Sequence, residues 1–374
     1  MAGIYVHIPF CKRKCIYCDF FSVAFSDAAA SRYADDLVSE FAVRKSELRG
    51  EKVHTLYIGG GTPSLMPIES LQKIVGNLVA DVGGLEEFTI EVNPDDITPG
   101  YADSLIALGC NRISMGVQSF NDGELQLLNR RHDAAEAEEA VKLLRSAGFG
   151  NISIDLIYGI PGQSMQSWED SVRKAIELGV EHISAYNLTY EEGTRLFHMR
   201  EKGRIEEASD NLCVEMFSML RKMLSDAGYE QYEISNFALP GWYSRHNSAY
   251  WDFTPYIGLG ASAHSFDGIC RRYNPSNLRK YMELVEKSGL AYTVEEEDKN
   301  ELFNEWVMVR LRTCSGMDLA QMLDRFGKEY VDTSMPILEK YANDGCLVLE
   351  NGIVRLTEKG IMLSDMIFRD LFVV

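Results

Sequence analysis

The sequence predicts an α/β fold: a partial barrel of six βα units, followed by a small C-terminal α+β domain of winged-helix type. Three observations lead to this prediction. Short apolar runs with strand character alternate with longer segments of helical periodicity from residue 4 to residue 188. Polar or glycine-rich segments follow the ends of several of these runs. Beyond residue 189 the regular alternation of strands and helices ends. The pair Asn351-Gly352 then predicts a tight turn between two short strands.

Strands and helices alternate regularly through the first 200 residues. Strands are expected at 4–8, 53–58, 87–92, 112–117, 152–158 and 182–188. Helices are expected at 27–48, 67–80, 99–108 and 134–147, and between 163 and 178. Strands joined by helices of this length form right-handed βα units and a parallel sheet. About six such units favour an open, partial barrel over a closed eightfold one, with the functional site at the carboxyl ends of the strands.

We expect three parts in the chain: the partial barrel over 1–200, a connecting region over 201–300, and the C-terminal domain over 301–374. The connecting region should hold a helix at 211–227 and an acidic linker at 289–300. The last part should contain helices, one of them over 334–343, and the two short strands. It carries 8 Lys and Arg against 12 Asp and Glu, so we expect a packing or docking domain and not a DNA reader.

The overall charge limits the classes of partner. The 374 residues include 37 Lys and Arg against 56 Asp and Glu, a net charge of −19, which argues against extended nucleic-acid binding. Contact with an anionic membrane needs a local basic patch, and the basic clusters are short: Lys12–Lys14, Arg130-Arg131 and Arg271-Arg272. We therefore expect at most peripheral membrane contact.

The chain shows neither a signal peptide nor an apolar stretch of the roughly 20 residues that a membrane span requires. Five of the eight cysteines are widely scattered, as expected of free thiols that fill small apolar gaps in a reducing compartment: Cys110, Cys213, Cys270, Cys314 and Cys346. These observations predict a cytoplasmic protein.

The remaining cysteines form a compact motif. Cys11, Cys15 and Cys18 are spaced C-x3-C-x2-C directly after the first predicted strand. Soft thiolates are the usual ligands of iron–sulfur clusters, and basic neighbours favour the thiolate form. A cubane has four irons, so three cysteines leave one iron open. Structural zinc needs a fourth ligand, and the nearby candidate His7 is separated from the motif by a proline.

Other residues at strand ends could bind a small molecule. The segment 59–62, Gly-Gly-Gly-Thr, allows a ligand to approach the backbone closely but lacks the Lys-Ser/Thr ending of a P-loop. Glu91, Gln118, Arg130 and Asp155 lie at or near strand ends, where each could bind a ligand, although a residue of this kind is more often a solvated or internally paired polar group. Asp155 interrupts an apolar strand, where an unpaired carboxylate is costly, so it is the strongest of the four.

The cysteine motif resembles that of the radical S-adenosylmethionine (SAM) superfamily. This resemblance implies a [4Fe–4S] cluster whose open iron chelates the amino and carboxylate groups of SAM. Further segments are similar to the coproporphyrinogen dehydrogenase-like family within it: YVHIPFC, GGGTPS, VNPD, GVQSF and DLIYGIPGQ. The likeness runs through nearly the whole chain. It implies that one or two SAM molecules contact Tyr5, Gly60, Gly61, Thr62, Glu91, Gln118, Arg130, Asp155 and Ala185, with the loop 159–162 bounding the adenine pocket.

Two branches of that family differ at positions that this sequence allows us to compare. The oxygen-independent coproporphyrinogen III dehydrogenases carry a further cysteine two residues after the third, where this chain has Phe20, and a longer segment before the motif. The HemW haem chaperones carry Cys-Asp-Phe after the loop and a His-Asn-x-x-Tyr-Trp motif, present here as residues 246–251. The resemblance therefore favours a haem chaperone that delivers haem to acceptor respiratory proteins, and that could act as a homodimer.

His246 is the first candidate for a haem contact. Imidazole is a common ligand of haem iron, and an aromatic neighbour can pack on a porphyrin. A His, Tyr and Trp cluster is also typical of a buried aromatic core with hydrogen-bonded polar tips. The other candidate histidines are His7, His132, His182, His198 and His264. The rival hypothesis is an enzyme, the radical oxidative decarboxylase of coproporphyrinogen III.

Overall fold

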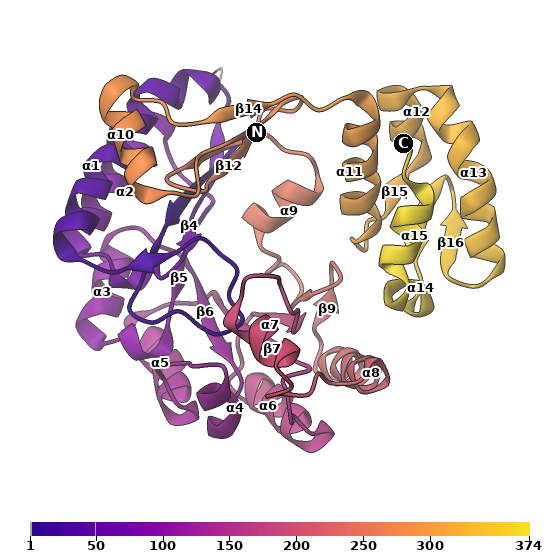
Figure 1. The fold of residues 1–374 in the computed structure, drawn as a ribbon, viewed down its shortest axis with the longest axis horizontal. Helices are drawn as coiled ribbons and strands as arrows, with labels where there is room; N and C mark the ends of the chain where they lie inside the picture. The colour runs from indigo at the N-terminus through magenta and orange to yellow at the C-terminus, as the bar shows by residue number, and fades with distance from the viewer. Residues whose placement is uncertain (1, 49) are drawn as a thin grey trace.

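The structure, a computed structural model, describes residues 2–48 and 50–374. Its central feature is one twelve-stranded sheet in the order β14-β13-β12-β11-β1-β4-β5-β6-β7-β8-β10-β9. Six consecutive neighbours in this sheet run parallel and in chain order: β1 (Ala2–Ile8), β4 (Val53–Gly60), β5 (Glu87–Val92), β6 (Arg112–Gln118), β7 (Ile152–Tyr158) and β8 (His182–Asn187). The predicted partial barrel is confirmed, and Figure 1 shows it as an open arc with helices outside.

The helices between these strands cover the outer face of the sheet. They are α1 (Asp27–Arg44), α2 (Ile68–Val82), α3 (Pro99–Ala107), α5 (Ala134–Ala147) and α6 (Met165–Glu177). The short α4 (Asp122–Leu127) is followed by Leu128, whose carbonyl accepts from the Ile16 amide of the cysteine loop. Alternate residues of each strand face them; on β6 these are Ile113, Met115 and Val117, all fully buried. Local sequence fixes the helix ends: a capping box starts α5 at Asp133, and Gly148 ends it in the left-handed conformation.

The connecting region contains more strands than the sequence suggested. β11 (Tyr256–Leu259) joins the edge of β1, and β12 (His264–Phe266), β13 (Arg271–Tyr273) and β14 (Thr293–Glu295) extend the sheet in antiparallel fashion. At the other edge β8 pairs with β10 (Asn236–Ala238), which pairs with β9 (Glu230–Gln231). The expected acidic linker at 289–300 therefore includes a strand, which its charged composition concealed.

Shorter elements complete this part of the chain. The pair β2 (Phe10–Cys11) and β3 (Val23–Ala24) frames the cysteine loop. Three helices follow β8 in the sequence before β11, namely α7 (Arg195–Glu201), α8 (Asp210–Asp226) and α9 (Arg245–Trp251), and α10 (Leu278–Ser288) packs on α1. Single 3₁₀ turns are η1 (Lys45–Leu48), η2 (Pro63–Leu65) and η3 (Pro94–Asp96). Figure 1 shows α9 on the open side of the sheet, between the strands and the C-terminal domain.

The C-terminal domain is the small α+β unit that the sequence predicted. It contains α11 (Lys299–Leu311), β15 (Met317–Asp318), α12 (Leu319–Phe326), α13 (Lys328–Asn343), β16 (Leu347–Glu350), β17 (Ile353–Leu356), α14 (Glu358–Met362) and α15 (Ser364–Leu371). Asn351 and Gly352 both have positive φ, the conformation of a tight hairpin turn between β16 and β17. Its hydrophobic core is separate from that of the barrel but includes Phe253 and Phe266 of the connecting region. The expected division at residues 200 and 300 stays a prediction.

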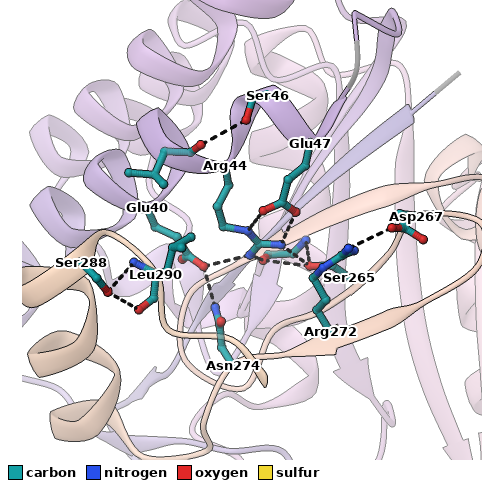
Figure 2. A network of polar contacts seen from close by, with 12 residues as sticks. Glu40, Arg44, Ser46, Glu47, Ser265, Asp267, Arg272, Asn274, Ser288 and Leu290 are labelled. Atoms are coloured by element: carbon teal, nitrogen blue, oxygen red, sulfur yellow. Dashed lines mark hydrogen bonds and ion pairs between the residues drawn. The ribbon is translucent and has the colours of Figure 1, made fainter. Parts of the chain in front are cut away.

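A buried polar network attaches the sheet extension to the barrel (Figure 2). Arg44 at the end of α1 is completely buried and pairs with Glu40, at 2.9 Å, which is also completely buried. The Arg44 guanidinium also donates to the Gly258 carbonyl of β11 at 2.7 Å and to the Ser265 hydroxyl of β12 at 2.9 Å. Glu40 accepts from the Gly260 amide, the Asn274 side chain and the Tyr281 hydroxyl. Every charge in this network is therefore paired and hydrogen-bonded.

Among the described residues, no helix is both long and apolar enough to cross a membrane.

We expect the replacement Arg44→Met to lower the free energy of unfolding by about 3–5 kcal/mol, because it leaves the Glu40 carboxylate buried without its cation. The control is Arg32→Met, which removes an exposed ion pair to Glu286 and should cost at most about 1 kcal/mol. Urea denaturation of both variants measures the difference. Equal losses in the two variants would show that the buried network does not hold β11 and β12 to α1.

Candidate functional site

The candidate site is a cavity of about 450 Å³ at the carboxyl ends of the barrel strands. The cysteine loop follows β1, and Cys11, Cys15 and Cys18 are free thiols that all line this cavity. Ten of the thirteen predicted site residues line it: the three cysteines with Gly60, Gly61, Thr62, Glu91, Gln118, Arg130 and Asp155. The volume lies in the usual range of small-molecule sites, ~300–1,000 Å³. One cavity thus joins segments that are far apart in the sequence.

The glycine segment after β4 packs directly on the cysteine loop. The Gly61 amide donates to the Ile8 carbonyl at 2.7 Å, and a Cβ atom on Gly61 would lie 2.8 Å from the Phe10 carbonyl and 3.1 Å from the Cys11 sulfur. The Thr62 hydroxyl donates to the same sulfur at 3.5 Å. Gly60 has φ of +109°, a conformation that favours glycine. These glycines are required because the backbone approaches the loop too closely for a side chain.

Arg130 fixes another side of the cysteine loop. Its guanidinium donates to the Cys15 sulfur at 3.3 Å, to the Asn93 side chain at 2.8 Å and to the Gly116 carbonyl at 2.5 Å. These contacts hold Cys15 against the strands β5 and β6. Burial raises the pKa of the Cys18 thiol to about 11 in the absence of metal, so this thiol gives up its proton when a cation binds.

The barrel interior is polar, unlike the packed aliphatic interior of a closed barrel. Along β6 the inward residues are Arg112, Ser114, Gly116 and Gln118, all of which line the cavity. In the neighbouring strands Glu91 of β5 lies beside Ser114, and Asp155 of β7 lies between Gly116 and Ser184. Gln118 has φ of +70° at a bulge between β6 and β7, a strained conformation that is common at functional sites. The interior therefore offers hydrogen-bonding groups to a ligand.

Two carboxyl groups within the cavity hold protons more tightly than usual. Burial raises the pKa of Glu91 to about 7, although its oxygens accept from the Tyr57 hydroxyl and the Gly60 amide, both at 2.9 Å. Burial likewise raises the pKa of Asp155 to about 6. Both groups can accept hydrogen bonds from ligand hydroxyl or amino groups, and a cationic ligand would favour their ionised forms.

The donor set of the loop fits a cluster better than a lone metal ion. The ligands of structural zinc converge on one point and number four. Within residues 2–48 and 50–374, no three His, Cys, Asp or Glu side chains are grouped to hold a single ion, and the loop cysteines are no exception. The three cysteines line one cavity, and as soft donors they would suit three irons of a cubane.

Tyr5, Ala185 and His246 do not line the cavity. Tyr5 points into the barrel, where its hydroxyl contacts the His7 ring at 3.0 Å. Ala185 is buried in the main core, and its amide donates to the Ser235 carbonyl. Any contact of these residues with a ligand stays a prediction.

His246 lies at the opposite end of the barrel from the cysteines. It belongs to α9, whose first amides, those of Arg245 and His246, donate to the Glu87 carboxylate at the start of β5. Its ring is fully buried, stacks on Tyr57 and contacts the Thr55 hydroxyl at 2.8 Å and the Tyr250 hydroxyl at 2.9 Å. Burial lowers the pKa of this imidazole to about 3. The His-Asn-x-x-Tyr-Trp motif thus closes the amino end of the barrel, and Asn247 lines the cavity from below.

Several cavity residues were missed by the sequence analysis: Tyr17, Asn93, Arg112, Ser114, Ser184, Tyr186, Asn187 and Asn247. A signal for some of them was present. The strand 112–118 reads Arg-Ile-Ser-Met-Gly-Val-Gln, with polar or small residues alternating with apolar ones, so a period of two places Arg112 and Ser114 on the face of Gln118. Asn247 belongs to the His-Asn-x-x-Tyr-Trp motif, but its place in the cavity could not be predicted because only the folding of α9 into the barrel brings it there.

Comparisons with known proteins agree with this geometry. The family model of the radical SAM superfamily matches residues 5–175, and that of the HemN C-terminal domain matches residues 298–363. "Heme chaperone HemW" of Bacillus subtilis (strain 168) is 32% identical over 377 residues, which cover 98% of each chain. The Escherichia coli (strain K12) protein of the same name is 37% identical over 265 residues, 70% of this chain and 69% of that one.

Among solved structures, coproporphyrinogen III oxidase (HemN) from Escherichia coli, described as a radical SAM enzyme, superposes with a TM-score of 0.86. It is 26% identical, and the match covers 99% of this chain and 90% of that one.

The raised pKa of Glu91 predicts a pH-dependent effect of Glu91→Gln on the ligand-free protein. Folding disfavours the carboxylate, so the stability that Glu91 contributes is present below its ordinary pKa of 4.5 and is lost as the pH rises through about 7. Glutamine cannot ionise. The variant should therefore gain about 3 kcal/mol relative to wild type between pH 4.5 and pH 8.

Denaturation at both pH values, with Glu192→Gln as a control at an exposed carboxylate, measures this change. A stability difference between Glu91→Gln and wild type that does not vary with pH would contradict the prediction.

Proposed function

The chain belongs to the HemW family of radical SAM proteins, and on this premise we propose that it is a cytoplasmic haem chaperone. In this proposal it holds a [4Fe–4S] cluster and SAM and delivers haem to acceptor haemoproteins such as respiratory enzymes. One observation carries the proposal: three cysteine thiols share a single cavity with a polar barrel interior, and among the described residues no fourth donor joins them in a group that could hold a lone metal ion.

The residues that line the cavity suit a [4Fe–4S] cluster and SAM. Cys11, Cys15 and Cys18 would ligate three irons, and the fourth iron would bind the amino and carboxylate groups of SAM. The backbone of Gly60 and Gly61 and the Thr62 hydroxyl offer close contacts beside that position. Bound together, cluster and SAM supply a one-electron reductant and a source of a carbon radical. Arg130 orients the loop by holding Cys15, while Gln118 and Asp155 offer hydrogen-bonding groups to the remainder of the ligand.

Two aromatic residues that line the cavity favour binding of haem over oxidation of a porphyrinogen. Phe20 lines the cavity and is 62% exposed, and Tyr186, which also lines it, is 42% exposed. Exposed aromatic rings beside a cavity suit the flat, apolar face of haem. Phe20 stands where the dehydrogenases that this chain resembles carry a further cysteine, so this site has no thiol there.

Coordination of haem iron by His246 would require a local rearrangement. If His246 coordinates the iron, its ring must leave Thr55 or Tyr250, because both ring nitrogens are engaged. The rings of His198 and His264 are exposed and need no such rearrangement. His7, His132 and His182 are buried and hydrogen-bonded. Haem binding by variants with each histidine replaced by alanine separates these candidates.

The second candidate function is oxygen-independent oxidative decarboxylation of coproporphyrinogen III. The observation in its favour is the structural match to HemN over 99% of this chain. An anaerobic assay of the reconstituted protein with coproporphyrinogen III, run beside a haem titration and a transfer assay to an apo-haemoprotein, separates the two functions. We expect stoichiometric haem binding and transfer without protoporphyrinogen. Product formation over many turnovers would overturn the chaperone proposal.

The replacement Gly61→Ala should disrupt the cluster site while leaving the fold intact. The added methyl would meet the Phe10 carbonyl and the Cys11 sulfur and push the loop outward. We expect iron and sulfide content after anaerobic reconstitution to fall from about four of each per chain to below half of that value. The control, Gly76→Ala, places a methyl on α2 where nothing lies within 4 Å, and it should retain full content. Full iron content in Gly61→Ala would contradict the proposed packing.

A further inference from the structure

Arg112 lies in the floor of the cavity, at the end away from the cysteine loop. It is the first residue of β6, faces the barrel interior and is only 1% exposed. In the sheet it lies beside Thr89 of β5, one inward layer below Glu91 and Ser114. Asn247 of α9 lines the same cavity from the end that α9 closes. Arg112 therefore places a guanidinium deep within the barrel.

This guanidinium lacks the partners that a buried charge requires. Its Nε and Nη1 atoms are buried and have no hydrogen-bond partner, and it forms no ion pair with any residue that the structure describes. Arginine stays protonated in proteins, so burial cannot neutralise it. A buried cation without an anion is costly, and native proteins rarely leave such a group unsatisfied.

The nearby carboxylates of the protein are engaged elsewhere. Glu87 accepts the amides of Arg245 and His246, and so fixes α9. Glu91 accepts from Tyr57 and Gly60, and Asp155 accepts from Ser184. Burial raises the pKa of both carboxyl groups and the charge of Arg112 opposes that rise, but neither carboxyl group forms an ion pair with Arg112. Two buried hydroxyl groups, those of Ser114 and Ser184, line the cavity above Arg112. The floor thus offers hydrogen-bond donors and a positive charge that forms no ion pair with a carboxylate of the described residues.

We propose that this floor is a carboxylate-binding subsite, in which Arg112 pairs with a carboxylate of a bound small molecule and Asn247 and Ser114 supply further hydrogen bonds. Guanidinium and carboxylate are complementary, since two parallel N–H···O bonds can form between them. The existence of the subsite is inferred only from the position, burial and missing partners of Arg112. Only the identity of its ligands rests on the proposed function.

The proposed function offers two sources of that carboxylate. The carboxylate of a SAM molecule on the open iron would lie at the cysteine end, so it could not also reach the floor. The floor would therefore bind the carboxylate of a second SAM molecule or a propionate of haem.

Binding of sodium propionate to the ligand-free protein tests the subsite itself. The probe is the ¹⁵N–¹H resonance of the Arg112 Nε–H group, identified by its absence from the spectrum of Arg112→Gln. We expect a saturable shift with propionate and none with propionamide, which has a similar shape but no charge. The control variant Arg13→Gln, at an exposed cavity-lining arginine beside the cysteines, should give the wild-type shift. An Arg112 resonance that does not respond to propionate would overturn the proposal. Arg112→Lys, which keeps the charge and also lacks this Nε–H group, gives the same assignment if Arg112→Gln does not fold.

Affinities then identify the source. If haem uses the subsite, esterifying its propionates lowers wild-type affinity about tenfold to a hundredfold, and Arg112→Gln abolishes that difference. If a second SAM uses it, the same pattern appears between SAM and decarboxylated SAM in protein without the cluster, where no iron chelates the carboxylate. Arg112→Lys should retain part of the affinity in either case. Failure of the wild-type protein to bind haem or SAM would overturn the proposed function but leave the propionate result unaffected, so the two failures can be told apart.

Discussion

The polar inner face of the six parallel strands is the constraint on which the rest of this structure depends. In a closed barrel, inward-facing Val, Ile and Leu side chains fill the interior. Here the same positions on β6 are Arg112, Ser114, Gly116 and Gln118, which cannot pack into a dry core. The barrel must therefore stay open and hold a ligand or solvent. Its stability comes from the outward-facing residues, which pack against the surrounding helices.

An open barrel also needs a floor, and the chain supplies one from a distant segment. The helix α9 enters the amino end, where Glu87 binds its first amides and His246 packs on Tyr57 and Thr55. Its position follows from the strand that comes next, since β11 pairs with β1 and the buried Glu40–Arg44 network holds β11 to α1. The Glu40–Arg44 network therefore helps to fix the position of α9, which closes the amino end of the barrel. The motif that suggested haem binding has, in this structure, a direct role in shaping the cavity.

Much of this arrangement could be predicted from the sequence because it depends on local patterns. The alternation of strands and helices gave the partial barrel, and parallel strands bring their carboxyl ends together, so Cys11, Gly60 and Asp155 were expected to meet. The sheet extension was not foreseen, because β12 to β14 have three residues each and β14 lies in an acidic run. Asn247 could not be assigned because its place depends on α9 folding into the barrel. Arg112 was missed, although its spacing from Gln118 indicated the inward face.

The central claim is that three thiolates hold a cubane whose fourth iron is open to a small chelating molecule. Mössbauer spectroscopy of ⁵⁷Fe-reconstituted protein, with and without SAM under anaerobic conditions, tests it most directly. The account predicts that about a quarter of the iron signal changes its isomer shift and quadrupole splitting when SAM is added, while the remainder does not. A spectrum that SAM leaves unchanged in all its components, or a site filled by zinc with four protein ligands, would contradict it.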